Sequence, residues 1–243
     1  MVRSAVYGRP KMPSVPPPKR HPYNQWSPDA RALDLVGDKW TLLIIRDLAA
    51  GPRRFVELQR VLPGISTEQL RSRLNRMVAD GLLTRQRYRE VPPRVDYELT
   101  ERAREVLPVV GALATWGYAW AWGPPRPGEA IDIGAILRAA SGVPVESRAP
   151  TGVVELSVAS RGRPERHYAM HVGRGRMTIS EQPAPDATAR VIGDETAWIE
   201  AFSPGGARSG LSFEGDERLA GLVLDACGSA AVAAATGTDA VAV

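Results

Sequence analysis

Apolar side chains recur every three or four residues in several segments near the N-terminus, which is the spacing of amphipathic helices. Ser27 and Pro28 are typical of a helix start and predict a first helix over residues 28–36. A second helix is expected between residues 38 and 51, with an aspartate as its cap and Gly-Pro at its end. A short third helix covers about residues 54–61.

The fourth helix has the clearest start signal. Ser66 is followed three residues later by Gln69, which is the spacing of a capping box. Gly81 supplies the left-handed residue that commonly ends a helix. Two runs of alternating polarity, residues 82–88 and 95–99, then predict the strands of a hairpin.

A closing helix, capped by Thr100, is expected to reach about Trp122. Three helices, a capped fourth, a hairpin and this helix describe a winged helix-turn-helix in residues 26–122. The basic, proline-rich residues 1–25 are expected to form a disordered arm. Residues 123–129 are rich in Pro and Gly and predict a linker.

Beyond the linker the pattern changes to that of a small α+β domain over residues 130–228, followed by a flexible tail, 229–243. The fold class is therefore α+β, with a winged helix-turn-helix first. The expected helices of the second domain cover about residues 131–140, 195–202 and 217–226, and the expected strands cover 153–159, 167–172, 177–180, 189–192 and 211–214.

Basic residues are concentrated in the first part of the chain. The protein has a formal net charge of +4, yet residues 1–125 hold 20 Lys and Arg against 12 Asp and Glu, and the remainder hold 11 against 15. A high-GC genome explains the preference for Arg over Lys but not this uneven distribution. A basic domain followed by an acidic one indicates that the first binds a polyanion such as DNA.

No run of apolar residues approaches the roughly 18 that a membrane-spanning helix needs, and the basic N-terminus has no apolar stretch of a secretory signal. We therefore expect a cytoplasmic, nucleoid-associated protein with no membrane partner. The single cysteine, Cys227, excludes an intramolecular disulfide and a cysteine-based zinc site. It lies among Leu and Val on the last predicted helix and is expected to be an inert core residue.

The helix that follows Ser66 has two different faces. Leu70, Leu74 and Met77 lie on an apolar face, whereas the opposite arc carries side chains that pair with base edges in a major groove. The N-terminus of the helix also favours a nearby phosphate. The alternative is a solvated face with charge pairs along the helix. The expected DNA contacts are Ser66, Thr67, Gln69, Arg71, Ser72, Arg73 and Arg76.

Arginines are also dense in the hairpin, with few acidic residues to oppose them. A ribbon tip of this kind can lie along the phosphate backbone or enter a minor groove, whose negative potential attracts arginine. Protection of an edge strand by charge is the alternative. The expected contacts from this wing are Arg87, Arg89 and Arg94.

Five segments carry a family resemblance that covers about residues 24–120. They are ALDLVGDKWTLLI (32–44), GPRRFVEL (51–58), LPGIS (62–66), ADGLL (79–83) and VPPRVDYELT (91–100). With these segments the chain resembles the HxlR family of MarR-like winged-helix regulators. The resemblance implies a homodimer, formed by the N-terminal and closing helices, on a near-palindromic operator with recognition helices about 34–36 Å apart.

The first helix departs from the pattern of that family. Many members have Cys-Pro there, and the thiol can sense oxidants or electrophiles, but this chain has Ser27 and Pro28. Without a thiolate that switch lacks its chemistry. The regulatory signal is therefore expected from elsewhere in the chain.

The second half offers a candidate for that signal. Its order of a hairpin (167–179), a helix with Trp198 and a Phe-Glu-Gly-Asp turn resembles a sterol-carrier-protein-type domain over residues 130–228. The resemblance implies a five-stranded sheet covered by helices around an apolar cavity for a hydrophobic small molecule. Core packing is the alternative for each wall residue. The candidate wall residues are Met170, Trp198, Phe202, Leu211 and Phe213.

Aromatic residues are denser in the closing helix than its packing needs. Trp116 and Trp120 are candidate ligand contacts, because sites at domain junctions commonly hold small molecules between aromatic walls. Burial at a dimer or interdomain interface is the alternative. Trp122 and Tyr118 belong to the same group.

Catalysis finds little support in the sequence. His167 and His171 share one face of a predicted strand, but no third metal ligand has suitable spacing, and no hydrolase or phosphate-binding motif is present. We expect no catalytic residue, no metal and no cofactor. A polar cavity that held one of these histidines beside a serine would favour a hydrolase instead.

These patterns together predict a DNA-binding transcriptional regulator, with repression favoured, that acts as a homodimer on double-stranded DNA. Its C-terminal domain is expected to sense a hydrophobic small molecule or to modulate the dimer. The alternative is a carrier of lipids or other hydrophobic ligands, or an interaction protein, that uses the winged helix only for dimerisation.

Overall fold

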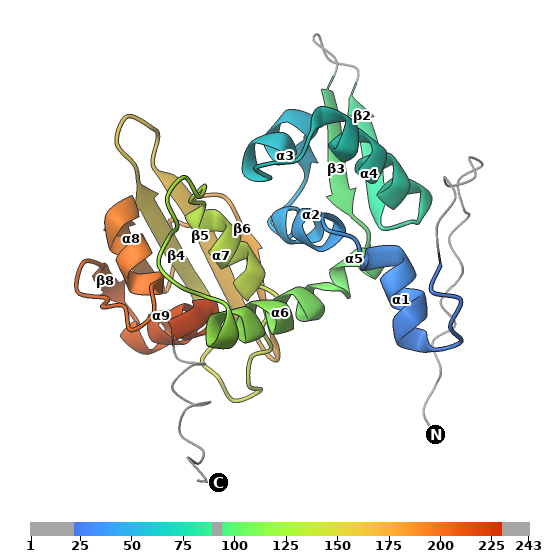
Figure 1. Cartoon of the computed structure of the whole chain (residues 1–243). Helices are drawn as coiled ribbons and strands as arrows, with labels where there is room; N and C mark the ends of the chain where they lie inside the picture. Colours follow the sequence, from blue (N-terminus) through green and yellow to red (C-terminus); the bar gives the residue numbers. More distant parts are fainter. Residues whose placement is uncertain (1–21, 89–93, 230–243) are drawn as a thin grey trace, which may run out of the picture. The chain divides into compact units, whose positions relative to one another are not determined.

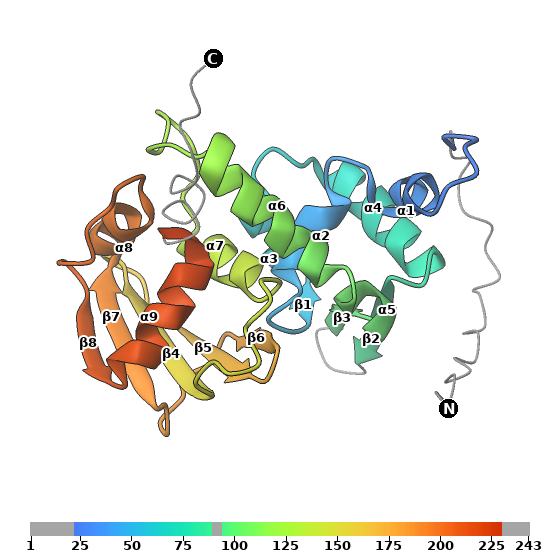
Figure 2. The same ribbon diagram turned by 90° about the horizontal axis from the view of Figure 1, so that it is seen from below.

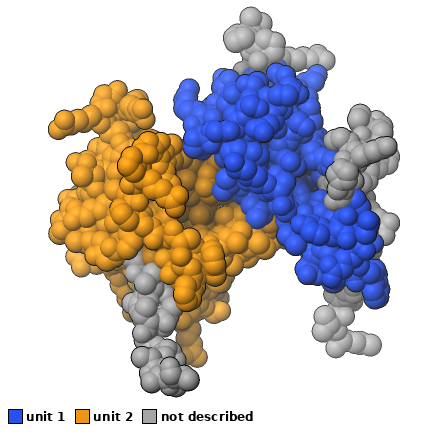
Figure 3. Space-filling view, in the orientation of Figure 1, with its two compact units in different colours: residues 1–44, 53–103 blue, residues 45–52, 104–243 orange. Residues whose placement is uncertain are grey.

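The computed structural model describes residues 22–88 and 94–229, which form two compact units (Figure 3). Unit 1 holds the described residues up to Ile44 together with Arg53–Ala103. Unit 2 holds Ile45–Pro52 and the described residues from Arg104 onward. The later division falls between Ala103 and Arg104, whereas the sequence suggested a domain boundary at the linker, residues 123–129. Most of the predicted arm, the tip of the wing and nearly all of the predicted tail lie outside the described residues.

Unit 1 combines helices with a small antiparallel sheet of order β1-β3-β2 (Figure 1). Strand β1 was not predicted, because two residues are too few to show an alternating pattern. Leu58, Leu70 and Leu74 are fully buried in the core of unit 1. The elements are α1 (Pro28–Val36), α2 (Thr41–Asp47, continuing into unit 2), β1 (Arg53–Arg54), α3 (Phe55–Val61), α4 (Thr67–Ala79), β2 (Leu83–Tyr88), β3 (Arg94–Leu99) and α5 (Glu101–Arg104).

The first helices begin where their capping residues predict. Ser27 Oγ accepts a hydrogen bond from the backbone N–H of Ala30 at 3.4 Å, which confirms it as the cap of α1. Asp38 Oδ1 accepts from the N–H groups of Trp40 and Thr41 at 2.9 and 3.1 Å. Since the first turn of a helix has no internal acceptor for these groups, Asp38 satisfies the start of α2.

The single closing helix predicted from Thr100 to Trp122 is wrong. The structure has two helices instead, α5 (Glu101–Arg104) and α6 (Leu107–Trp120). Pro108 explains the break, because proline has no N–H and its ring would clash with a carbonyl one turn earlier inside a continuous helix. It is tolerated in the first turn of α6, where that N–H has no partner in any case.

Unit 2 contains a five-stranded sheet of order β6-β5-β4-β7-β8, in which only the β4–β7 pair is parallel. Helices α7, α8 and α9 pack on one face of this sheet (Figures 1 and 2). The elements are α7 (Ile133–Ala140), β4 (Gly152–Ala159), β5 (Arg166–Gly173), β6 (Arg176–Ser180), β7 (Ala189–Asp194), α8 (Glu195–Phe202), β8 (Ser212–Gly215) and α9 (Glu217–Leu224), followed by one π-helical turn (Asp225–Ser229).

The α+β pattern predicted for the second half is therefore present, with small differences at the ends. The predicted last helix ends two residues earlier, at Leu224, where the π-helical turn begins. Cys227 lies in that turn and is buried, and burial raises the pKa of its thiol to about 12. A thiol that holds its proton so firmly has little nucleophilic thiolate at neutral pH.

Helix α6 packs closely against other parts of unit 2. Gly111 and Gly142 approach so nearly that a Cβ on either residue would overlap backbone atoms. Near the other end of the helix, Trp122 Nε1 donates to the carbonyl of Phe202 at 2.7 Å. The Tyr118 ring fills the space above Gly228, and burial raises the pKa of its hydroxyl. One side of α6 therefore contacts the rest of unit 2 near both ends of the helix.

Candidate nucleic-acid interface

Helices α3 and α4 are joined by a short turn, and the start of α4 is sharply defined. Gly64 in this turn has a φ of +84°, which glycine adopts without strain. Ser66 Oγ accepts from the N–H of Gln69 at 3.1 Å, and Gln69 Oε1 accepts from the N–H of Ser66 at 3.2 Å. The predicted capping box is confirmed.

Helix α4 presents one apolar and one polar face, as its sequence predicts. Leu70, Leu74 and Met77 are buried in unit 1. The opposite face is exposed and carries Thr67, Gln69, Arg71, Ser72 and Asn75. It therefore presents donors, acceptors and a positive charge to whatever approaches this helix.

Some polar side chains on this face already have partners. Gln59 of α3 donates to Thr67 Oγ1 at 2.8 Å, and the Gln69 amide belongs to the capping box. Arg71 pairs with Glu68 at 3.3 Å, but its side chain is 60% exposed, so this ion pair is weak and easily exchanged. Within the described residues Ser72 makes no side-chain hydrogen bond.

Two other predicted contacts are held against unit 1 itself. Arg73 Nη1 lies 2.9 Å from Asp38 Oδ2, and its side chain is 30% exposed. Arg76 Nε lies 3.3 Å from Asp80 Oδ2, and only 12% of its side chain is exposed. Their roles in DNA contact stay a prediction, but the side chains of both are less exposed than that of Arg71, whose ion pair with Glu68 lies at the surface.

The wing carries the remaining predicted contacts. Arg85 and Arg87 are exposed on β2, while Arg89 lies outside the described residues. Arg94 pairs with the buried carboxylate of Asp96, with 2.6 Å between Nη2 and Oδ2, and its guanidinium stacks 5.1 Å from the centre of the Tyr88 ring. In the described part of the wing, the Arg87 side chain is therefore more accessible to DNA than that of Arg94.

The arrangement of α3, turn, α4 and hairpin agrees with the comparison with known proteins. The sequence profile described as HxlR-like helix-turn-helix matches residues 35–123. The HTH-type transcriptional regulator sll1512 of Synechocystis sp., itself uncharacterized, is 42% identical over 93 residues, which are 38% of this chain and 69% of the relative. The chain belongs to the HxlR-like helix-turn-helix family.

Further known proteins match a similar share of the chain. The uncharacterized HTH-type transcriptional regulator BH0655 of Halalkalibacterium halodurans is 43% identical over 94 residues, which are 38% of this chain and 83% of the relative. A solved structure, described as the redox regulator HypR in its oxidized form, is 36% identical and covers 37% of this chain and 94% of its own, with a TM-score of 0.37. The HxlR-like match ends at residue 123, so α7 and everything after it lie beyond the match.

The residues predicted to contact a ligand fall into two separate groups. Met170, Trp198, Phe202 and Leu211 are buried in the core of unit 2, and Phe213 packs against them. Trp198 also donates from Nε1 to the carbonyl of Ser157 at 2.9 Å, which anchors its ring between α8 and the sheet. Trp116 and Trp120 are not part of this cluster, because they lie exposed on α6.

A polar cluster lies on the face of the sheet opposite α7, α8 and α9. Ser157 Oγ and Glu155 Oε1 both contact Nδ1 of His167, at 3.0 and 3.1 Å. A hydrolytic triad needs its nucleophile and its carboxylate on different ring nitrogens, so this contact pattern is not that of a triad. Glu155 also accepts from the N–H of Ala184 at 2.6 Å, which holds the β6–β7 loop over the sheet.

Among the residues that the structure describes, no three His, Cys, Asp or Glu side chains are grouped as a metal ion would require. No helix in residues 22–88 or 94–229 has the length and apolar character needed to cross a membrane.

One strongly constrained residue pair was missed by the sequence interpretation. Asp47, at the end of α2, is fully buried and pairs with the buried Arg138 of α7. A signal was present in the sequence, because Asp47 follows Ile44 by three residues on the buried side of α2. Similarly, Arg138 stands directly beside the buried Leu137 in an otherwise apolar helix.

Proposed function

We propose that this protein is a DNA-binding transcriptional regulator that inserts α4 into the major groove. The observation that carries the proposal is the exposed polar face of α4, opposite a fully buried apolar face and behind a complete capping box. A helix with this exposure fits the major groove, where arginine pairs with guanine and serine with any base. Membership of a helix-turn-helix family supports the same conclusion.

DNA binding requires no chemistry on the substrate, and a regulator of this kind is not an enzyme. The positive wing would contact phosphates and fix the register of α4, while α4 itself supplies the sequence preference. Bound over a promoter on nucleoid DNA, the protein would exclude polymerase, so we propose repression as its effect.

We further propose that it binds DNA as a homodimer through α6. Val109, Leu113, Trp116 and Trp120 recur at helical spacing on one face of α6, and the two tryptophans are 61% and 77% exposed. A second copy of the same face would remove this apolar surface from water. Two copies of α4 would then read two half-sites of a near-palindromic operator.

For unit 2 we propose a sterol-carrier-like fold that modulates this dimer, with a hydrophobic small molecule as its effector. The five-stranded sheet with helices on one face supports this proposal, as does the aromatic content of its core. Binding would require the core around Trp198 and Phe202 to open, since both rings are buried. An effector regulates DNA binding only if it has different affinities for the DNA-competent and DNA-incompetent dimers.

Selection from a pool of random duplexes, followed by fluorescence anisotropy, tests the function directly. The wild-type protein should prefer the selected duplex over a scrambled one by about 10³-fold. The double variant Arg71→Ala, Ser72→Ala should lose most of that preference, because neither side chain has a strong partner within unit 1.

The matched control is Arg174→Ala, which removes one exposed positive charge from the turn between β5 and β6. It should bind both duplexes with nearly wild-type affinity. Equal affinity of the wild-type protein for selected and scrambled duplexes would contradict the proposed function and favour the ligand carrier.

A further inference from the structure

Helix α2 has an aspartate at each end, and each aspartate pairs with an arginine from a distant helix. Before its first turn, Asp38 caps the helix and lies 2.9 Å from Nη1 of Arg73 on α4. At its last residue, Asp47 Oδ1 lies 3.1 Å from Nε of Arg138 on α7. The boundary between the two units falls within α2, after Ile44, so the helix belongs to both.

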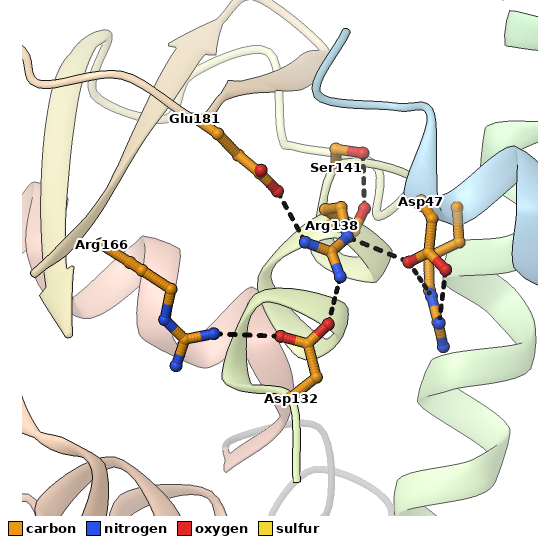
Figure 4. Close-up of polar contacts among 7 residues, drawn as sticks. Asp47, Asp132, Arg138, Ser141, Arg166 and Glu181 are labelled. Atoms are coloured by element: carbon orange, nitrogen blue, oxygen red, sulfur yellow. Dashed lines mark hydrogen bonds and ion pairs between the residues drawn. The ribbon is translucent and has the colours of Figure 1, made fainter. Parts of the chain in front are cut away.

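Arg138 is the centre of a buried ionic cluster (Figure 4). Besides Asp47, its guanidinium donates to Glu181 Oε1 at 2.6 Å and to Asp132 Oδ2 at 2.5 Å. Arg46 completes the partners of Asp47, donating from Nε and Nη2 at 3.0 and 3.1 Å. Each nitrogen of the Arg138 guanidinium therefore donates to a different carboxylate.

The burial of this cluster is unequal. Asp47 is fully buried and the Arg138 side chain is 2% exposed, whereas Asp132 and Glu181 reach solvent. Burial alone would lower the pKa of Arg138, but Asp47, Asp132 and Glu181 outweigh it and raise that pKa, so the guanidinium stays charged. Water cannot replace Arg138 as readily at Asp47 as at the two other carboxylates.

A buried ion pair is a poor way to gain stability, because desolvation offsets most of the attraction, and apolar residues of similar volume often do as well. What distinguishes such an ion pair from apolar packing is that it fixes the directions in which its partners can lie. The guanidinium fork accepts carboxylates only in fixed directions, so it permits one position of the end of α2 relative to α7.

We propose that Arg138 is a positioning residue for DNA recognition, which holds α2 through Asp47 and thereby α4 through Asp38 and Arg73. This inference rests on the proposed function and names the regulation of the same site. The proposed dimer helix α6 and Arg138 both belong to unit 2, while α4 belongs to unit 1. Helix α2 begins in unit 1 and ends in unit 2, so under this proposal a change at Asp47 would alter how two copies of α4 bind their half-sites.

The test uses the full chain and a series of duplexes in which the spacing of the selected half-sites changes by one or two base pairs. The variant Asp47→Asn keeps the shape of the side chain and leaves Arg138 with Asp132 and Glu181. We expect the wild-type protein to prefer its selected spacing by about tenfold, a typical coupling between sites, and the variant to retain about twofold. Near-ultraviolet circular dichroism confirms that the variant is folded.

Two control variants separate this link from general stability. Glu181→Gln removes a different carboxylate from Arg138, and Arg46→Met removes the other partner of Asp47. Both leave the contact between Asp47 and Arg138, so both should keep the wild-type spacing profile. If Asp47→Asn does not fold, Arg138→Lys replaces it, since lysine keeps the charge but cannot reach three carboxylates at once.

The outcomes distinguish the two proposals. A wild-type protein that prefers one spacing, beside a folded Asp47→Asn variant with the same preference, overturns the positioning role and leaves DNA recognition intact. A wild-type protein that selects no duplex overturns the proposed function and this inference with it. If only Asp47→Asn loses the spacing preference, while the wild-type protein and both control variants keep it, the result supports both the proposed function and the positioning role of Arg138.

Discussion

At the scale of single residues, the arginine side chains of α4 differ in their ion-pair partners and in their exposure to solvent. Arg73 and Arg76 are paired with Asp38 and Asp80 and are mostly covered, while Arg71 is exposed. A helical wheel places Arg76 on the polar arc and Arg71 and Arg73 on its flanks, yet Arg76 is the least exposed of the three, so the wheel alone did not predict this difference. Only the contacts with residues before and after α4 show which of them are available to a ligand.

Asp80 leads to a prediction about pH. Burial raises the pKa of this carboxyl, against the opposing effects of Arg76, Arg102 and Arg73. A raised pKa in the folded state means that ionised Asp80 opposes folding at neutral pH, and that this effect disappears as the pH falls below the ordinary value for aspartate. Asp80→Asn should therefore gain stability relative to the wild-type protein at pH 7 and lose that gain towards pH 3.8.

Urea denaturation at several pH values measures the difference. Asp186→Asn, at an exposed position, controls for the loss of one negative charge. If Asp80→Asn is instead less stable than the wild-type protein at pH 7, and this deficit shrinks as the pH falls, the carboxylate is stabilised by its arginines rather than opposed by burial.

At the scale of elements, local signals in the sequence were sufficient where a helix start depends on neighbouring residues. The caps at Ser27 and Ser66 were predicted from a few consecutive residues and are present. Local sequence patterns did not predict a very short strand or a contact between residues far apart in the chain. Strand β1 has only two residues, and Asp47 and Arg138 are 91 positions apart, so no local pattern could pair them.

The path of α6 depends on two glycines, which gives a second prediction. Because a Cβ at Gly111 would overlap the backbone at Gly142, Gly111→Ala should lower the free energy of unfolding by about 1–3 kcal/mol. On the same helix nothing lies within 4 Å of a Cβ at Gly117. There, Gly117→Ala should raise stability by up to about 1 kcal/mol through helix propensity.

Thermal or urea denaturation of the two variants provides a comparison within one helix. Equal effects of both substitutions would show that α6 does not depend on close contact with the turn after α7.

At the scale of the whole molecule, the chain joins a family-typical DNA-binding part to a second unit beyond the family match. The closing helix groups with unit 2, although the HxlR-like match includes it. Under the proposals above, regulation would act through unit 2 and would need no cysteine in the first helix, where this chain has Ser27 and Pro28.

The exposed face of α6 provides the corresponding prediction for assembly. Trp116→Glu places a charge in the centre of this face and should convert dimers to monomers in sedimentation experiments at micromolar concentration. Thr115→Glu, the exposed neighbouring position about 100° around the helix, should affect assembly less. Sedimentation of Trp116→Glu as a wild-type dimer would place the interface elsewhere.

The most direct measurement of the central claim is a hydroxyl-radical footprint of the protein on its selected duplex. Two copies of α4 in successive major grooves should protect two regions whose centres are about 10–10.5 base pairs apart, on one side of the duplex. The pattern should vanish with Arg71→Ala, Ser72→Ala. A single protected region, or uniform protection that the double variant leaves unchanged, would contradict recognition of DNA by a pair of α4 helices.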